Sequence, residues 1–361
     1  MKKLFTLVAV ALMAGGAYAQ TTVNDGETIT GDLLATALAG GTEATIQIAE
    51  GATVSVNSLS EDGETTKLAI PEGASVAFVG QGEGATLKFP ESLDITGTHQ
   101  YIRFENVTIV DDGCQYFINQ PSDALPCTVG ELSLKGVTIN GLERSLVRFQ
   151  NTGAAQEITH LVIDDCVISN QGSGNYAFIR ANNAAYTIGT VDITNSTFST
   201  FQHNFMEMGG ANITAVNVSK STFYNVIGDG RYLMDFKGVA TNVSLTDVVL
   251  AKTYAASTSR GIRTDGTVTT TNTYVSSDFV LDRYPFAEGT VITEPALTAA
   301  ELFQDVENGD FTIMEESLSQ LGDPRWIETP SGIDGVTVGE PVDEDAPVYN
   351  LSGQRVSKDT K

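Results

Sequence analysis

The chain has 361 residues, with 20 Lys and Arg against 45 Asp and Glu, and its net charge at pH 7 is −25. Such an acidic surface disfavours nucleic acid and anionic membranes as partners, because phosphate groups are bound by clustered cations. After the N-terminal segment, no stretch of the sequence is long and apolar enough to span a bilayer.

Residues 1–19 have the three parts of a secretory signal peptide. Two lysines precede an apolar run over residues 4–14, and Ala17 and Ala19 form an A-x-A cleavage site. We therefore expect an exported protein that acts outside the cell, on its surface or in the periplasm. Next, residues 31–41 (GDLLATALAGG) carry a short helix signal, and this helix is expected to cap the first coil of the fold that follows.

A seven-residue phrase recurs through the middle of the chain. It occurs as RFENVTI (103–109), SLKGVTI (133–139), VIDDCVI (162–168), DITNSTF (192–198), NVSKSTF (217–223), SLTDVVL (244–250) and TYVSSDF (273–279). The phrase ends lie 30, 29, 30, 25, 27 and 29 residues apart, and such a regular period is typical of a solenoid. Val, Ile, Thr and Phe favour strands, and no helical period lies between the phrases. The sequence therefore predicts an all-β parallel β-helix.

Two sets of residues within this repeat have structural interpretations. Asn106, Asp165, Asn195 and Asp247 share one position of the phrase, and we expect them to form turns. Cys166 replaces small residues of the repeat and is expected to be buried.

The other two cysteines flank a loop. Export permits disulfides, so Cys114 and Cys127 could be joined, and two free thiols are the alternative. No Cys or His spacing resembles a zinc site.

The repeat stops near residue 283. Residues 298–313 predict a short helix, an Asn-Gly turn and a last strand, and residues 322–326 close the domain, which thus spans 20–326. Residues 327–347 are rich in Pro, Gly and acidic residues and are expected to form a linker. The segment 348–361 follows as a separate C-terminal piece.

These segments carry a resemblance to a known family. The coils, together with SRGIRTDG (259–266), NTYVSSDFV (272–280) and the stretch 302–326, resemble exported Bacteroidetes proteins of the pectin-lyase-like superfamily. Within it they are similar to uncharacterised families, domains of unknown function, that accompany glycan-utilisation systems. The resemblance covers roughly residues 40–326. It implies a right-handed parallel β-helix and a polysaccharide partner. PVYNLSGQRV (347–356) resembles the start of a C-terminal sorting segment that is incomplete here.

Charged residues recur in the second strand of five successive coils. They are the central residues of LVRFQ, FIRAN, FMEMG, LMDFK and GIRTD: Arg148, Arg180, Glu207, Asp235 and Arg263. Their steps of 32, 27, 28 and 28 residues follow the repeat, and their neighbours are mostly apolar. Because strand side chains alternate between faces, we expect one outward column of charge. Lys237 and Asp265 are expected two residues further along the same face.

Two interpretations of this column stay open. In the first, Arg180–Glu207 and Asp235–Arg263 form a ladder of ion pairs across coils. In the second, the column is a glycan site whose arginines hold carboxylates, and Glu207 and Asp235 form an acid pair or a Ca²⁺ site. We favour the ladder or a non-catalytic binding face. The resemblance transfers no catalytic residue, because no histidine lies in the Gly-His-Gly motif of polygalacturonases.

Aromatic rings are a second route to sugar binding. Phe178 and Phe205 are candidates for the outer face beside the column, and Tyr116, Tyr176, Tyr232 and Tyr254 are expected near coil turns. The predicted function is an exported glycan-binding or glycan-associated protein without catalysis. The alternative is a polysaccharide lyase or glycoside hydrolase acting on an acidic, uronic-acid polysaccharide.

Overall fold

The structure is a computed structural model. It describes residues 19–59, 65–120, 126–149, 154–173, 175–181, 185–327, 348–349 and 355–356. The chain divides into two compact units, residues 1–327 and 328–361. In the second unit β33 (Val348–Tyr349) and β34 (Arg355–Val356) pair antiparallel. Residues 1–18 of the expected signal peptide and residues 328–347 of the expected linker lie outside the described residues.

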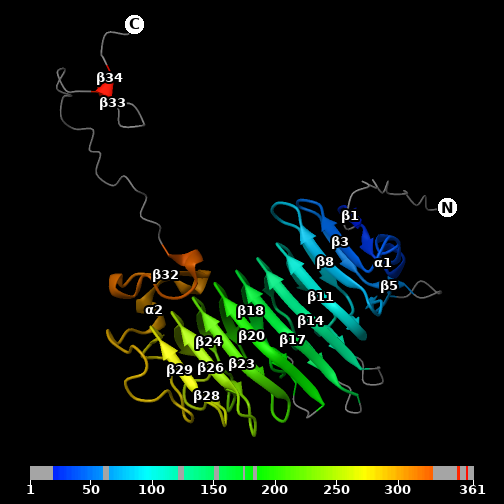
Figure 1. Cartoon of the computed structure of the whole chain (residues 1–361). Helices are drawn as coiled ribbons and strands as arrows, with labels where there is room; N and C mark the ends of the chain where they lie inside the picture. Colours follow the sequence, from blue (N-terminus) through cyan, green and yellow to red (C-terminus); the bar gives the residue numbers. More distant parts are fainter. Residues whose placement is uncertain are drawn as a thin grey trace. The chain divides into compact units, whose positions relative to one another are not determined.

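The first unit is a parallel β-solenoid of three sheets (Figure 1). Sheet A contains β1 (Ala19–Val23), β3 (Glu43–Ile48), β8 (Ser75–Gly80), β11 (Gly97–Glu105), β14 (Cys127–Lys135), β17 (Gln156–Asp164), β20 (Tyr186–Thr194), β23 (Asn212–Ser219), β26 (Asn242–Thr246) and β29 (Val268–Thr271). Sheet B contains β2 (Thr28–Ile29), β4 (Thr53–Val56), β9 (Thr86–Phe89), β12 (Thr108–Asp111), β15 (Thr138–Asn140), β18 (Val167–Gln171), β21 (Thr197–Phe201), β24 (Thr222–Val226), β27 (Val249–Thr253) and β30 (Tyr274–Val275).

Sheet D completes eight of the coils and carries the predicted column. It contains β7 (Ala69–Ile70), β10 (Leu93–Ile95), β13 (Tyr116–Gln120), β16 (Ser145–Phe149), β19 (Ile179–Arg180), β22 (Met206–Glu207), β25 (Tyr232–Asp235) and β28 (Arg260–Arg263). The chain runs from sheet A to B to D in the eight coils from β3 to β28, and neighbouring strands pair parallel. A small antiparallel pair, β5 (Ser58–Leu59) with β6 (Thr65–Thr66), is set into the N-terminal part. The predicted all-β parallel solenoid is thus confirmed.

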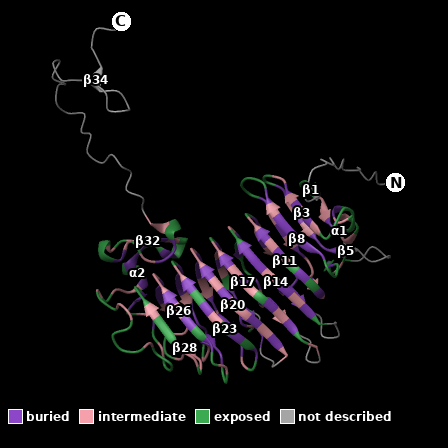
Figure 2. Cartoon of the chain, in the orientation of Figure 1, coloured by how far each residue is buried: buried purple, intermediate pink, exposed green. Residues whose placement is uncertain are grey.

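The core is a column of inward side chains enclosed by the three sheets. Along the strands of sheet A buried positions alternate with more exposed ones, as Figure 2 shows, and this is the pattern that the period of two requires. Aromatic residues stack between coils: Phe78 lies on Phe104, and Phe198 lies on Phe223 with ring centroids 4.9 Å apart. Such contacts join each coil to its neighbours.

The repeated phrase marks the corner between sheets A and B. Its fourth residue has a positive φ at Asn106 (53°), Asp165 (55°), Asn195 (49°) and Asp247 (55°), which confirms the predicted turn position. Asn and Asp adopt this left-handed conformation more readily than most residues. In the structure the seventh phrase ends at Val275, four residues before the end that the sequence predicts. Asn272 has the positive φ of 46°, and Val275 pairs with Leu250.

Two elements flank the coils. Near the N-terminus, α1 (Gly31–Ala37) begins after Thr30, whose side chain accepts a hydrogen bond from the Leu33 amide, and Leu34 is buried. After the last coil, α2 (Ala299–Leu302), β31 (Phe303–Asp305), η1 (Val306–Asn308), β32 (Asp310–Ile313), η2 (Glu316–Leu318) and η3 (Pro324–Trp326) follow. This confirms the helix, Asn-Gly turn and strand predicted for residues 298–313.

This C-terminal element, residues 297–327, packs on sheet B. Phe303, Phe311 and Leu318 form a buried cluster with Tyr224 and Val249. Further along, the buried Asp323 carboxylate accepts a hydrogen bond from Thr197 at 2.7 Å, and the Asp323 amide donates to Thr222 at 3.1 Å. The element therefore contacts several coils at once.

All three cysteines are buried free thiols. Of the two alternatives for Cys114 and Cys127, the structure has the unjoined pair. Burial raises the pKa of Cys127 and of Cys166 to about 12, so these thiols stay protonated and unreactive near neutral pH. Cys166 is fully buried in the core, as expected.

Candidate functional site

The charged column lies in register on sheet D. Arg148 pairs with Arg180 in the strand ladder, Arg180 with Glu207, Glu207 with Asp235, and Asp235 with Arg263. The predicted register is confirmed. The column extends towards the N-terminus through Asn119 and Asp94, which pair in the same way.

The C-terminal half of the column is a ladder of ion pairs. Arg263 donates from Nε and Nη2 to the two carboxylate oxygens of Asp235 at 2.7 and 2.5 Å. This bond to Asp235 raises the pKa of Arg263. The Nε atom of Arg180 lies 3.6 Å from Glu207 Oε2. The ladder interpretation therefore holds for four of the five residues.

The N-terminal half brings like charges together. Arg148 and Arg180 are direct neighbours on adjacent strands, where like charges repel each other. Burial lowers the pKa of Arg148, and Arg180 and Arg144 lower it further. The Arg148 guanidinium lies 4.1 Å from the centroid of the Tyr116 ring, and Arg180 lies 4.9 Å from that of Tyr176. The tyrosine faces stabilise these cations.

The other predicted site residues of the face lie outside the strand positions of the column. Lys237 and Asp265 are exposed in the turns that follow β25 and β28. Phe178 and Phe205 were expected on the outer face, but both are buried in the core. Tyr254 is 44% exposed, away from the column contacts.

A second column runs four residues before the first. It comprises Arg144, Tyr176, His203 and Arg231, with the same steps of 32, 27 and 28 residues. These residues lie at the start of each sheet D strand or just before it, and a further arginine, Arg260, begins β28. The sequence analysis did not identify Arg144, His203 and Arg231 as site residues. Their spacing, which equals that of the first column, is the signal that could have found them.

A pocket of about 410 Å³ lies between the two columns. Asn175, Tyr176, Arg180, His203, Glu207 and Arg231 line it. His203 is 5% exposed, and its Nδ1 atom is buried without a hydrogen-bond partner among the described residues. Burial, together with Arg231 and Arg180, lowers the pKa of His203 to about 4. Near neutral pH the pocket thus presents a neutral imidazole beside two guanidinium groups.

A neighbouring depression of about 370 Å³ continues the face towards the N-terminus. Lys67, Tyr116, Asn119, Arg144 and Arg148 are among its lining residues. Asn119 donates to Asp94 at 2.9 Å, and Lys67 lies 3.8 Å from the same carboxylate. Among the described residues, six arginines lie on the sheet D strands or in the turns that lead into them: Arg144, Arg148, Arg180, Arg231, Arg260 and Arg263.

The predicted Ca²⁺ ligands are already engaged. Glu207 faces Arg180 and Asp235 is held by Arg263, so a cation would have to displace an arginine from each carboxylate. Within the described ranges, no group of three or more His, Cys, Asp or Glu side chains is placed to hold a metal ion.

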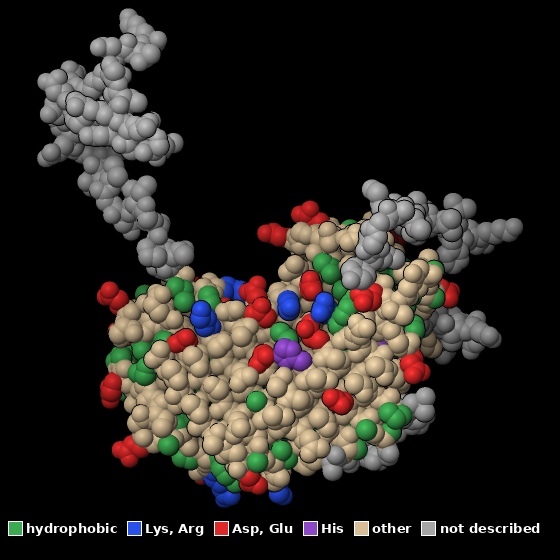
Figure 3. All heavy atoms as spheres, viewed as in Figure 1, with side chains coloured by type: hydrophobic (Ala, Val, Ile, Leu, Met, Phe, Trp, Pro, Cys, Tyr) green, Lys and Arg blue, Asp and Glu red, His purple; other side chains and the backbone are tan. Residues whose placement is uncertain are grey.

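Sheet A offers a contrasting surface. Charges are scattered over the face in Figure 3, and most of the surface between them is uncharged. Arg103 donates to Glu131 at 2.8 Å, and His160 Nε2 lies 2.7 Å from Asp192. These groups satisfy one another, so this face is a weaker candidate for an anionic ligand.

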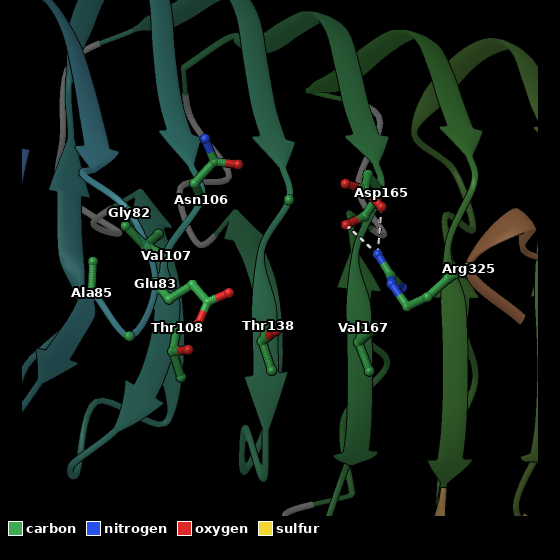
Figure 4. A pocket seen from close by; sticks show the side chains of 12 residues that line it. Gly82, Glu83, Ala85, Asn106, Val107, Thr108, Thr138, Asp165, Val167 and Arg325 are labelled. Carbon is green, nitrogen blue, oxygen red and sulfur yellow. Dashed lines mark hydrogen bonds and ion pairs between the residues drawn. The ribbon is translucent and has the colours of Figure 1, made fainter. Parts of the chain in front are cut away.

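A third pocket, of about 300 Å³, lies at the corner of sheets A and B (Figure 4). Glu83 stands on one side, and Thr108 and Thr138 form part of the lining. Its arginine, Arg325, is bonded to Asp165 and to the buried Asp323. That arginine thus ties the C-terminal element to the coils rather than facing a ligand.

The fold and this site define a parallel β-solenoid with an arginine-rich outer face on one sheet. Residues 216–326 match a family described as a domain of unknown function, DUF5123. The matched part includes the C-terminal end of the column and the C-terminal element. No curated protein matches the chain. No solved structure matches it either. Among the described residues, no helix has both the length and the hydrophobicity to cross a lipid bilayer.

Proposed function

We propose that this protein binds an acidic polysaccharide along the outer face of sheet D and does not cleave it. The observation that carries the proposal is the pair Arg148 and Arg180, in register on a chain whose net charge is −25. An acidic protein that gathers six arginines on one face gains electrostatically when a carboxylate or sulfate lies between them. Tyr176, which is half-buried, adds ring surface for sugar contact beside these cations, and the buried Tyr116 ring supports Arg148 from below.

The proposal also covers where the protein acts and how its coils are wound. The protein is exported and acts on the outside of the cell or in the periplasm of a Bacteroidetes species, in association with glycan utilisation. Its β-helix winds right-handed, and α1 covers the first coil.

A second candidate function is cleavage of the same polysaccharide, and the pocket at His203 favours it. Arg180 and Arg231 would hold the carboxylate of a uronate, and the neutral His203 would take the proton from the adjacent ring carbon. The bond to the leaving oxygen would break as a carbon–carbon double bond forms, and water would protonate the leaving oxygen.

The test combines binding and product formation on the same protein. Affinity electrophoresis in gels containing acidic polysaccharides should retard the protein, whereas neutral glucans should not. Arg148→Ala and Arg180→Ala should each weaken retardation about tenfold, and Arg103→Ala on sheet A is the matched control. Ultraviolet absorbance reports an unsaturated uronate product. Product that disappears in His203→Gln would establish cleavage, whereas equal migration in all gels would refute binding at this face.

A further inference from the structure

The arginine face contains the same arrangement of side chains twice. In the first copy, Arg144 donates from Nη1 to the Tyr116 hydroxyl at 3.0 Å, 28 residues away in sequence. In the second copy, Arg260 donates from Nη1 to the Tyr232 hydroxyl at 3.1 Å, again 28 residues away. In both copies the tyrosine begins one sheet D strand, and its arginine lies at the start of the next.

A second arginine completes each copy. Arg148 lies 4.1 Å above the Tyr116 ring and Arg263 lies 4.4 Å above the Tyr232 ring. We call the two sets module 1 (Tyr116, Arg144, Arg148) and module 2 (Tyr232, Arg260, Arg263). Each module thus places two guanidinium groups around one ring.

The modules also share a tyrosine neighbour and an unmet hydrogen bond. Tyr176 contacts the Tyr116 ring at 5.5 Å, and Tyr284 contacts the Tyr232 ring at 5.8 Å, measured between centroids. The Nε atoms of Arg144 and Arg260 are buried and have no hydrogen-bond partner among the described residues. The Nε atom of Arg144 lies 3.7 Å from Glu143 Oε1. Ring contacts and tyrosine hydroxyls hold Arg144, Arg148 and Arg260 in place, which favours the planar, forked binding of a carboxylate or sulfate. In module 2 the fork of Arg263 already binds Asp235, so Arg260 is the arginine that meets an added anion.

The distance between the modules follows from the strand order. Sheet D runs β13-β16-β19-β22-β25-β28, so module 2 lies four strands beyond module 1. At the strand spacing of a β-sheet this is about 19 Å. A sugar in an extended glycan advances by about one strand spacing, so a single glycan chain that follows the solenoid axis can reach both modules.

The surface between the modules carries both signs of charge. The column positions between Arg148 and Arg263 are Arg180, Glu207 and Asp235. Glu207 lies beside Arg180, and Asp235 is bonded to Arg263 of module 2. The two carboxylates of this stretch are therefore neutralised by arginine partners.

We infer that modules 1 and 2 are two anion sites that bind one acidic glycan chain bivalently. This inference rests on the proposed function and adds the ligand's minimum length. Binding at the second module is then intramolecular, so affinity rises sharply once a chain spans both modules.

The experiment is a length series of hyaluronan oligosaccharides, in which a uronate alternates with a neutral sugar, measured by calorimetry on the whole protein. We expect affinity to step up by about tenfold or more between the tetrasaccharide and the hexasaccharide. Arg144→Gln and Arg260→Gln, one in each module, should each abolish the step. Arg103→Gln should keep it, and the thermal unfolding of all variants checks folding.

The outcomes separate the two proposals. A smooth rise with length, or a step lost in only one of the two variants, overturns bivalent binding while the glycan-binding function stands. If no acidic oligosaccharide of any length binds, the proposed function itself fails.

Discussion

Acidification should destabilise this protein through His203. The side chain is 5% exposed, and burial together with Arg231 and Arg180 lowers its pKa from 6.5 to about 4. The unfolded chain therefore takes up a proton near pH 6.5, whereas the folded protein does so only near pH 4. The stability contributed by the neutral imidazole is full above the unfolded pKa and is lost as the pH falls through this window. By proton linkage the loss is up to about 2 kcal/mol at pH 5.

Urea unfolding of the wild type and of His203→Gln, near neutral pH and at about pH 5, measures this loss. The many carboxylates titrate in both proteins, so their contribution cancels in the difference. The wild type should lose up to about 2 kcal/mol more than the variant on acidification. Equal losses in the two proteins would refute the argument that a buried, neutral His203 opposes protonation in the folded state.

Three substitutions test the packing and the ladder by urea unfolding. Asp235→Ala leaves the guanidinium of Arg263 without its two short bonds and should cost about 2 kcal/mol. Phe198→Ala removes a fully buried ring from the aromatic core and should cost about 3–5 kcal/mol. Gly136→Ala places a Cβ 2.5 Å from Asn106 Oδ1 at a φ of 62° and should cost more than about 1 kcal/mol.

Each of two substitutions has a matched control. Asp282→Ala removes a partner of Arg283 from an exposed pair and should change stability by less than about 0.5 kcal/mol. Gly230→Ala has a similar φ of 66° but meets no atom within 4 Å, so it isolates backbone strain from the steric contact. If Asp235→Ala were as mild as Asp282→Ala, the buried end of the column would contribute nothing to stability.

Sequence reasoning placed the column correctly because two independent periods agree there. The repeat of about 28 residues put Arg148, Arg180, Glu207, Asp235 and Arg263 on successive coils, and strand alternation put them outside. Strand alternation gives the wrong face for the residues two positions before Arg180 and Glu207. β19 and β22 contain two residues each, so Phe178 and Phe205 precede the strands and turn into the core.

The rest of the site could not be predicted from strand rules. Arg144, His203 and Arg231 lie in the turns between sheets B and D, whose lengths differ from coil to coil. Their partners, such as the Tyr116 hydroxyl that Arg144 contacts, are set by that turn geometry. The seventh phrase was misplaced for a related reason, because TTTNTYV (269–275) and TYVSSDF (273–279) overlap and both fit the apolar pattern.

The C-terminal element changes how this solenoid should unfold. In a simple solenoid each coil contacts only its neighbours, so the array can fray from its ends. Here η3 reaches back more than 100 residues, with Asp323 bonded to Thr197 and Thr222 and Arg325 bonded to Asp165. The C-terminal element thus links the coils of β18, β21 and β24. These coils should exchange their amide hydrogens as one cooperative block rather than one coil at a time.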